Sequence, residues 1–135
     1  MEFDSGKQIS ITGKIHLSPK RVSFNLLSGP KWSDGLNLHV DVRHDFLGKN
    51  TVVINAYNPN TYQWGRDQLF SLPDDLRPNT EFTITLTAEE ERFRVKVNEQ
   101  VEYYQTYVHG PDPSAFVEYF DITGDVDISQ ICFIS

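Results

Sequence analysis

Apolar and polar side chains alternate strictly through the middle of the chain. In the run 36–43, three aliphatic residues alternate with three polar ones: Leu38, Val40 and Val42 with His39, Asp41 and Arg43. Successive side chains of an extended strand point to opposite faces of its sheet. The run therefore predicts a half-buried strand with a polar outer face.

The next alternating run is able to extend this polar face. Residues 52–57 place Val52, Ile54 and Ala56 on one side and Val53, Asn55 and Tyr57 on the other. If the two runs pair, Asn55 joins the polar surface of the first run. Beyond a turn-rich loop come Trp64, Gly65, Arg66 and Asp67. A tryptophan beside glycine and charge fits no core pattern, so we expect Trp64 to be partly exposed. Trp32, in an earlier connection, is expected to cover the edge of a core.

Strand-like runs recur at intervals of roughly ten residues along the rest of the chain. They span 8–13, 14–17, 21–27, 68–72, 81–87, 92–97 and 100–107, and the last strands are expected between 115 and 134, broken at Gly124. Gly13 is expected to separate the first two runs, and 81–87 is expected to form a hairpin with 92–97. No segment has a helical period and no linker divides the chain. The pattern predicts an all-β fold, an antiparallel two-sheet β-sandwich, in a single domain of residues 1–135.

Length and charge narrow the classes of partner. A chain of 135 residues is long enough to bury a core without disulfide or metal staples. The formal net charge of −7 argues against nucleic acid and anionic membrane surfaces as partners, because both would repel the chain. The lone Cys132 cannot form an intramolecular disulfide, which is compatible with a reducing compartment.

No targeting or membrane segment is visible in the sequence. The first ten residues lack the basic flank and apolar core of a secretory signal, and no apolar run approaches transmembrane length. An Asn-x-Ser/Thr acceptor is also absent. We therefore expect no membrane insertion and a cytoplasmic location, with export by a route without a signal peptide left open.

The polar face combines groups that suit a sugar. His39, Asp41, Arg43 and Asn55 supply hydrogen-bond donors and acceptors, and Trp64 beside them supplies a flat apolar surface. A pyranose has hydroxyls that need paired hydrogen bonds and a patch of C–H bonds that packs on an indole. An ordinary solvated sheet face is the alternative, in which Asp41 and Arg43 form an exposed ion pair worth roughly 0.2–1 kcal/mol.

Catalysis and metal binding have weaker support. Asp41 and Asp67 are the carboxylates available to a glycosidase, but Arg43 beside Asp41 favours the ionised form, and no second group is set to donate a proton. His16, His44 and His109 lack the spacing of metal ligands. We expect a protein that is not an enzyme and needs no metal or other cofactor.

Compared with known families, the chain resembles the galectins, the β-galactoside-binding lectins. Their signature is His-x-Asn-x-Arg on one strand, Val-x-Asn on the next, and Trp-Gly-x-Glu-x-Arg after a loop. The corresponding segments here are 39–43 (HVDVR), 53–55 (VIN) and 64–69 (WGRDQL). Similar segments at 6–13, 93–98 and 122–128 extend the resemblance over nearly the whole chain and imply a galectin-like jelly-roll sandwich.

The resemblance implies a galactose site and a changed neighbouring subsite. In it, His39 and Arg43 bond the axial 4-hydroxyl of galactose, Asn55 bonds the 6-hydroxyl, and Trp64 stacks on the apolar face. Three positions depart from the signature: Asp41 replaces its Asn, Asp67 replaces its Glu, and Leu69 replaces its second Arg. Arg66 is a candidate to compensate for that lost arginine, although its parity on the strand is wrong.

These residues predict a lectin for galactose-containing glycans, with weakened or altered specificity at the neighbouring subsite, where Arg66, Asp67, Tyr57 and the loop 58–63 would select the adjoining saccharide. The alternative is a galectin-fold protein-interaction module that has lost most sugar binding, motivated by Asp41 and Leu69. Whether the chain forms a homodimer stays open.

Overall fold

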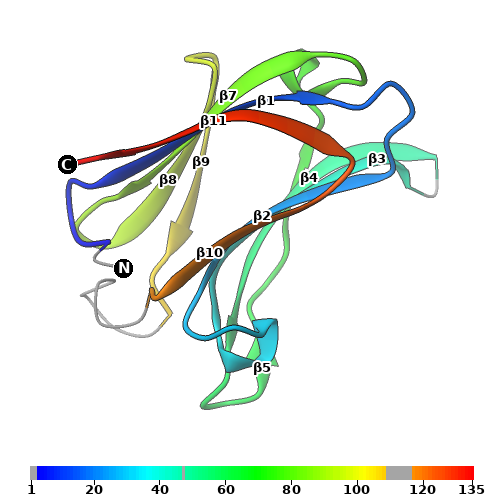
Figure 1. The fold of residues 1–135 in the computed structure, drawn as a ribbon. Helices are drawn as coiled ribbons and strands as arrows, with labels where there is room; N and C mark the ends of the chain where they lie inside the picture. The colour runs from blue at the N-terminus through cyan, green and yellow to red at the C-terminus, as the bar shows by residue number, and fades with distance from the viewer. Residues whose placement is uncertain (1–2, 47, 109–116) are drawn as a thin grey trace.

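Two antiparallel sheets pack face to face in the computed structural model, which describes residues 3–46, 48–108 and 117–135 (Figure 1). One sheet has five strands in the order β11-β1-β7-β8-β9. Their bounds are β1 Gln8–Ile15, β7 Glu81–Ala88, β8 Arg92–Val97, β9 Val101–Thr106 and β11 Val126–Ile134. The predicted hairpin is confirmed, because β7 pairs with β8 in antiparallel register.

The second sheet carries the alternating runs from the middle of the chain. Its main order is β10-β2-β3-β4-β5, and β6 also pairs with β4. The strands are β2 Arg21–Leu27, β3 Leu36–Phe46, β4 Lys49–Asn58, β5 Gln63–Trp64, β6 Gln68–Ser71 and β10 Tyr119–Gly124. His39 of β3 lies opposite Asn55 of β4, so the two polar faces are continuous as expected. The predicted two-sheet β-sandwich is confirmed.

The core lies between the sheets and is built from the apolar half of each alternating strand. Leu38 and Val42 of β3 and Ile9 and Ile11 of β1 are fully buried. Burying a large aliphatic or aromatic side chain stabilises the fold by about 1.5–3 kcal/mol. Since the apolar residues of β3 point inward, their polar neighbours necessarily point to the outer face of the sheet.

The first strand differs from expectation. Residues 8–15 form the single strand β1, and Gly13 does not end it. Instead the register with β11 shifts between Thr12 and Gly13, which is a bulge. A Cβ at Gly13 would lie 2.6 Å from the carbonyl oxygen of Asp127, so glycine permits the close approach of the two strands there.

Strands β10 and β11 form the edges of their sheets on the same side of the sandwich (Figure 1). The chain turns between them after Gly124, as expected. Residues 115 and 116, where another strand was predicted to begin, lie outside the described residues. Phe133 and Ile131 of β11 lie opposite Ile9 and Ile11, on the inner face of the sheet. They are nevertheless 64% and 41% exposed, so this edge of the core is open.

Helical structure in the described part of the chain consists of two single-turn 3-10 helices, η1 Trp32–Asp34 and η2 Asp74–Leu76. Neither comes near the length or the apolar character needed to span a membrane. The first of them matters for the site, because η1 lies in the connection between β2 and β3.

Candidate functional site

A cavity of about 400 Å³ opens on the outer face of the six-stranded sheet. Its lining includes five of the predicted site residues: His39 and Arg43 from β3, Asn55 from β4, Trp64 from β5, and Asp67 just before β6. The strand pairing explains why residues far apart in sequence meet here, since β4 lies between β3 and both β5 and β6. Trp64 is 45% exposed, which confirms the expectation of partial exposure.

Asp41 lies beneath this surface and is not part of the cavity lining. Its side chain is fully buried, with one oxygen 2.6 Å from Arg21 Nε and the other 2.7 Å from Arg43 Nε. The hydroxyl of Ser23 donates to the first oxygen at 3.2 Å. The ion pair of Asp41 and Arg43, which belonged to the alternative of a solvated sheet face, is present, but its carboxylate is buried and not exposed. Two guanidinium groups from adjacent strands cover the carboxylate, which alternation within one strand cannot reveal.

The charge of Asp41 is maintained by these partners. Burial on its own raises the pKa of the carboxyl, but the hydrogen bonds and charges of Arg21 and Arg43 outweigh burial and hold the pKa below the usual 3.8. An unpaired buried carboxylate would cost several kcal/mol. The practical result is a fixed arrangement, in which Asp41 orients the two arginines instead of facing the cavity.

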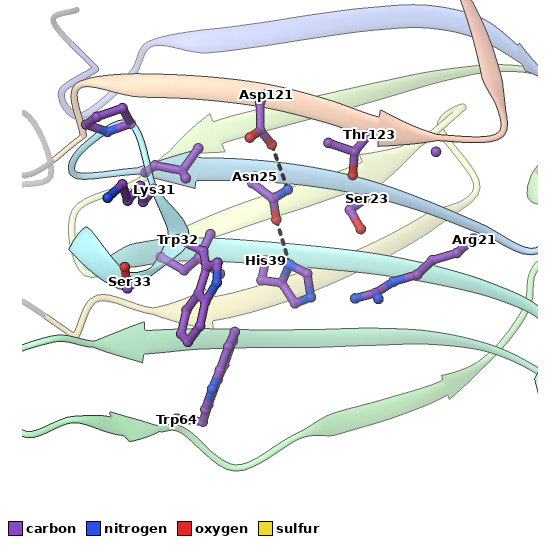
Figure 2. A pocket seen from close by; sticks show the side chains of 14 residues that line it. Arg21, Ser23, Asn25, Lys31, Trp32, Ser33, His39, Trp64, Asp121 and Thr123 are labelled. Carbon is purple, nitrogen blue, oxygen red and sulfur yellow. Dashed lines mark hydrogen bonds between the residues drawn. The ribbon is translucent and has the colours of Figure 1, made fainter.

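His39 is held by a chain of hydrogen bonds that crosses three strands (Figure 2). Its Nδ1 lies 2.5 Å from Asn25 Oδ1 on β2, and the amide nitrogen of Asn25 donates to Asp121 Oδ1 on β10 at 2.7 Å. Because the Asn25 oxygen only accepts, His39 carries its proton on Nδ1. The other ring nitrogen, Nε2, is then a hydrogen-bond acceptor.

The surroundings of His39 also favour its neutral form. Burial lowers the pKa of the imidazole from 6.5, and the positive charges of Arg21 and Arg43 lower it further, against the opposing effect of Asp41. A neutral ring with its proton on Nδ1 is thus the ordinary state near pH 7. His39 accordingly offers a ligand hydroxyl an acceptor.

The amide nitrogen of Asn55 donates two hydrogen bonds within the protein, which uses both of its N–H groups. Its amide nitrogen donates to the carbonyl oxygen of Gly65 at 3.0 Å and to Asp67 Oδ1 at 2.6 Å. The carbonyl of Asn55 accepts from the backbone N–H of Ala56 at 2.8 Å. A Cβ at Gly65 would come within 2.9 Å of Asn55 Oδ1, so glycine allows the loop to approach this side chain. With both N–H donors of Asn55 used in this way, its carbonyl oxygen and the Asp67 carboxylate can meet a ligand only as acceptors.

Trp64 belongs to a cluster of aromatic rings. Trp32 of η1 stacks on Trp64 with ring centroids 5.6 Å apart and planes 24° apart. Tyr57 contacts both indoles at centroid distances of 5.1 and 5.3 Å, and it is buried beneath them. Trp32 is 53% exposed, so the expectation that it covers the edge of the core is wrong. The ring lies on the same outer surface as Trp64 because η1 carries it there.

A larger cavity of about 680 Å³ continues from Trp64 over β3, β2 and β10 (Figure 2). Its lining includes Trp32 and Trp64 at one end and Arg21 and Thr123 among the polar groups. Arg21, His39 and Trp64 line both cavities, whereas Trp32 lines only the larger one. The two cavities therefore share a border along β3, and Trp32 does not line the smaller cavity.

Two residues that the family resemblance assigns to the neighbouring subsite lie outside both cavities. Arg66 is exposed, and it borders neither cavity although Gly65 and Asp67 beside it do. Leu69 on β6 is 65% exposed and lies opposite Val53. These positions therefore give no support to the prediction that Arg66 compensates for the arginine that Leu69 replaces. The wrong parity of Arg66 on the strand points the same way.

Arg21, Asn25 and Trp32 are site residues that sequence reasoning missed. Val22, Phe24 and Leu26 alternate as the apolar face of the run 21–27, and the residues between them and before them, Arg21, Ser23 and Asn25, must then share the opposite face. In the hairpin of β2 and β3, Arg21 lies opposite Arg43 and Asn25 lies opposite His39. The same alternation would have placed both beside the predicted site, whereas no pattern in the sequence locates Trp32.

The site is rich in hydrogen-bonding groups and offers little for catalysis. Asp41 is buried between arginines and Asp67 is held by Asn55, so the two carboxylates do not face one another across an open cavity. Among the described residues, His, Cys, Asp and Glu side chains do not gather into a group able to hold a metal ion. The arrangement is suited to binding a polyhydroxylated ligand with one apolar face.

Comparisons with known proteins agree with this chemistry. A family model described as galactoside-binding lectin matches residues 1–133. The structure is similar to ligand-free congerin I, with 22% identity, coverage of 98% of this chain and 94% of that one, and a TM-score of 0.81. It is also similar to CG-16, a homodimeric agglutinin from chicken liver, with 25% identity, the same coverages and a TM-score of 0.80. A search of curated protein sequences gave no match.

Proposed function

Because the chain belongs to the galectin family of galactoside-binding lectins, and is thus a carbohydrate-binding domain, we propose that it binds β-galactosides in the smaller cavity. One observation carries the proposal. The cavity is bordered by Trp64 together with His39, Arg43 and Asn55, although these residues come from three different strands. This combination meets both the apolar and the polar surface of a galactose ring.

Each polar group has a defined part in the proposed complex. The 4-hydroxyl donates to His39 Nε2 and accepts from the Arg43 guanidinium, while the 6-hydroxyl donates its one proton to the carbonyl oxygen of Asn55 or to the carboxylate of Asp67. The C–H face of the sugar packs on Trp64. A neutral hydrogen bond contributes about 1 kcal/mol net, so affinity for a single galactose is modest.

The neighbouring subsite differs from the family signature in ways that weaken or shift its specificity. Asp67 is tied to Asn55 at 2.6 Å, and Arg43 is tied to Asp41 at 2.7 Å. Leu69 supplies an apolar surface where the signature has a charged donor. We expect the second saccharide to be chosen by apolar contact and shape more than by bonds to charged groups.

Calorimetric titration with lactose tests the proposal. Wild type binds, and Trp64→Ala reduces the affinity by about tenfold or more because the apolar platform is removed. Leu17→Ala is the control, since Leu17 is 74% exposed and lines neither cavity. Absence of lactose binding in wild type would reject the proposal. A protein partner captured equally well with and without excess lactose would instead support a protein-interaction module.

A second copy of the chain is the partner we propose for the open edge at β10 and β11. Phe133, Ile131, Ile134 and Tyr119 expose large apolar surfaces there. The similar CG-16 is described as a homodimer. Pairing of two edges would cover these side chains and would place two sugar sites in one particle.

A further inference from the structure

Asp41 bonds two arginines that come from different strands. In the pairing of β2 with β3, Arg21 lies directly opposite Arg43. The carboxylate of Asp41 meets Arg21 Nε with one oxygen, at 2.6 Å, and Arg43 Nε with the other, at 2.7 Å. Like charges in directly opposed positions destabilise a strand pair. The carboxylate therefore bridges two cations that would otherwise repel each other across β2 and β3.

The bond to Asp41 also fixes the orientation of Arg43. Nε is the guanidinium nitrogen nearest the main chain, and the guanidinium is planar. A bond at Nε therefore constrains the plane of the whole group and the directions of its terminal N–H donors. Arg43 lines the smaller cavity, where the proposed complex uses it as the donor to the 4-hydroxyl of galactose. Asp41 is fully buried and lines neither cavity, so it affects the ligand through Arg43 and not by contact.

Arg21 compensates for the burial of this carboxylate. Burial raises the pKa of Asp41, and the hydrogen bonds from Arg21 and Arg43 are the largest effects that lower it. Without Arg21, one arginine alone would have to compensate for the burial. With a neutral side chain at position 41, the two arginines would face each other without an anion between them. Each member of the pair therefore suits this surface only when the other is present.

We propose that Arg21 and Asp41 are coupled positioning residues, which together hold Arg43 in the orientation that binds galactose. Arg21 balances the charge of Asp41, and Asp41 anchors Arg43. The pair takes the place of the neutral Asn that the family signature has at position 41. The inference rests on the proposed binding of galactose, because the orientation of Arg43 is measured by its bond to the sugar.

A double-mutant cycle in lactose binding, measured by calorimetry, tests the coupling. Asp41→Asn leaves two facing arginines with an amide that balances neither charge, so Arg43 loses its orientation and affinity is expected to fall about tenfold. Arg21→Gln leaves Arg43 bonded to Asp41 and should change affinity by less than about threefold. The double variant removes the facing cation together with the carboxylate, and its affinity should return to within about threefold of wild type.

The titration of His39 provides a readout that a purely structural role would not change. Burial lowers the pKa of His39 most, and the charge of Asp41 opposes burial, as does that of Asp121 to a smaller degree. The charges of Arg21 and Arg43 lower this pKa further. The guanidinium of Arg21 extends from β2 toward His39 (Figure 2). In NMR titrations, Asp41→Asn is therefore expected to lower the His39 midpoint, and Arg21→Gln is expected to raise it.

Asp74→Asn is the matched control. Asp74 also accepts from an arginine Nε at 2.7 Å, that of Arg77, but it is 91% exposed and lies outside both cavities. This variant should keep the lactose affinity and the His39 midpoint of wild type. Urea unfolding of every variant checks that it folds. The coupling should appear there as well, since the double variant should lose less stability than the two single variants together.

The outcomes separate the two proposals. Wild-type lactose affinity in Asp41→Asn overturns its positioning role. A double variant that binds as weakly as Asp41→Asn overturns the coupling, and so do His39 midpoints that shift in the same direction in both single variants. An equal loss of affinity in Arg21→Gln and Asp41→Asn also overturns it, because Arg21 would then act on lactose directly. Failure of wild type to bind lactose rejects the proposed function, and the urea and NMR measurements then decide whether Arg21 and Asp41 are coupled.

Discussion

The tautomer of His39 is set by two side chains from neighbouring strands. Asn25 accepts from Nδ1 and is itself oriented by Asp121, so the acceptor nitrogen Nε2 is left for a ligand. Burial and the arginine charges add to this by lowering the pKa of the ring. At the scale of single residues, the site is thus tuned by groups that do not belong to the family signature.

Acid is expected to weaken lactose binding through His39. Because its pKa is lowered below 6.5, the ring stays neutral at and above neutral pH, and affinity is constant there. As pH falls below 6.5, Nε2 gains a proton and can no longer accept from the 4-hydroxyl, which reduces affinity roughly fivefold. Calorimetry from about pH 8 to about pH 5, with an NMR titration of the imidazole, measures both changes. A midpoint above 6.5 contradicts the prediction.

Single-residue features were predictable where alternation alone decides them. His39, Arg43 and Asn55 fall on one surface because the side-chain period of a strand is two. The burial of Asp41 depends instead on Arg21 and Arg43 closing over it from two strands. Predicting such a contact requires the register between the strands, which a single sequence does not give.

At the scale of elements, the connection between β2 and β3 shapes the site. The carbonyl oxygen of Trp32 accepts from Gly35 N at 3.1 Å, and Gly35 O accepts from Ser28 N at 2.9 Å, which fixes the single turn η1. Trp32 is held against Trp64 as a result. A short ordered connection thereby supports the aromatic platform, while the strands supply the polar groups.

Trp32→Ala is expected to weaken lactose binding by about two- to tenfold, because an aromatic pair contributes about 0.5–1.5 kcal/mol and Trp64 would lose its stacked neighbour. Trp32→Phe keeps an aromatic ring at the position and should retain most of the affinity. Calorimetric titrations of the two variants beside wild type make the comparison. Equal affinity of Trp32→Ala and wild type would show that Trp64 does not need this support.

Elements were predicted better than their irregularities. The alternating runs located most strands, including the whole of β2 and the hairpin of β7 and β8. At Gly13 the pattern predicts the end of a strand, but a glycine inside a strand also permits a bulge, and the sequence alone does not distinguish the two. The expected position of Trp32 is wrong for a related reason. The path of a connection depends on backbone hydrogen bonds in turns, and these leave no periodic pattern in the sequence.

At the scale of the whole molecule, the sandwich is asymmetric in its surfaces. The outer face of the six-stranded sheet carries both cavities of the candidate site, and the edge formed by β10 and β11 exposes apolar side chains from the inner layer. Alternation predicted the two sheets and their inner faces, but not that this edge would remain open. The single domain over residues 1–135 stays a prediction.

A dimer that depends on Phe133 is expected. In light scattering after size-exclusion chromatography, wild type should approach twice the monomer mass as its concentration rises, and Phe133→Asp should remain a monomer. A charge at this 64% exposed edge position would have to be desolvated in the interface. Leu17→Asp, at another exposed apolar residue, should behave as wild type. A wild-type monomer at all concentrations contradicts the proposed pairing.

The stacking of Trp32 on Trp64 has a spectroscopic consequence. The chain contains two tryptophans, and both border the cavities, so its indole emission originates entirely at the site. With ring centroids 5.6 Å apart, the two chromophores are close enough to couple electronically and give paired bands of opposite sign in ultraviolet circular dichroism. A ligand that packs on Trp64 would change the emission and these bands together, so the unlabelled protein carries its own optical reporter of occupancy.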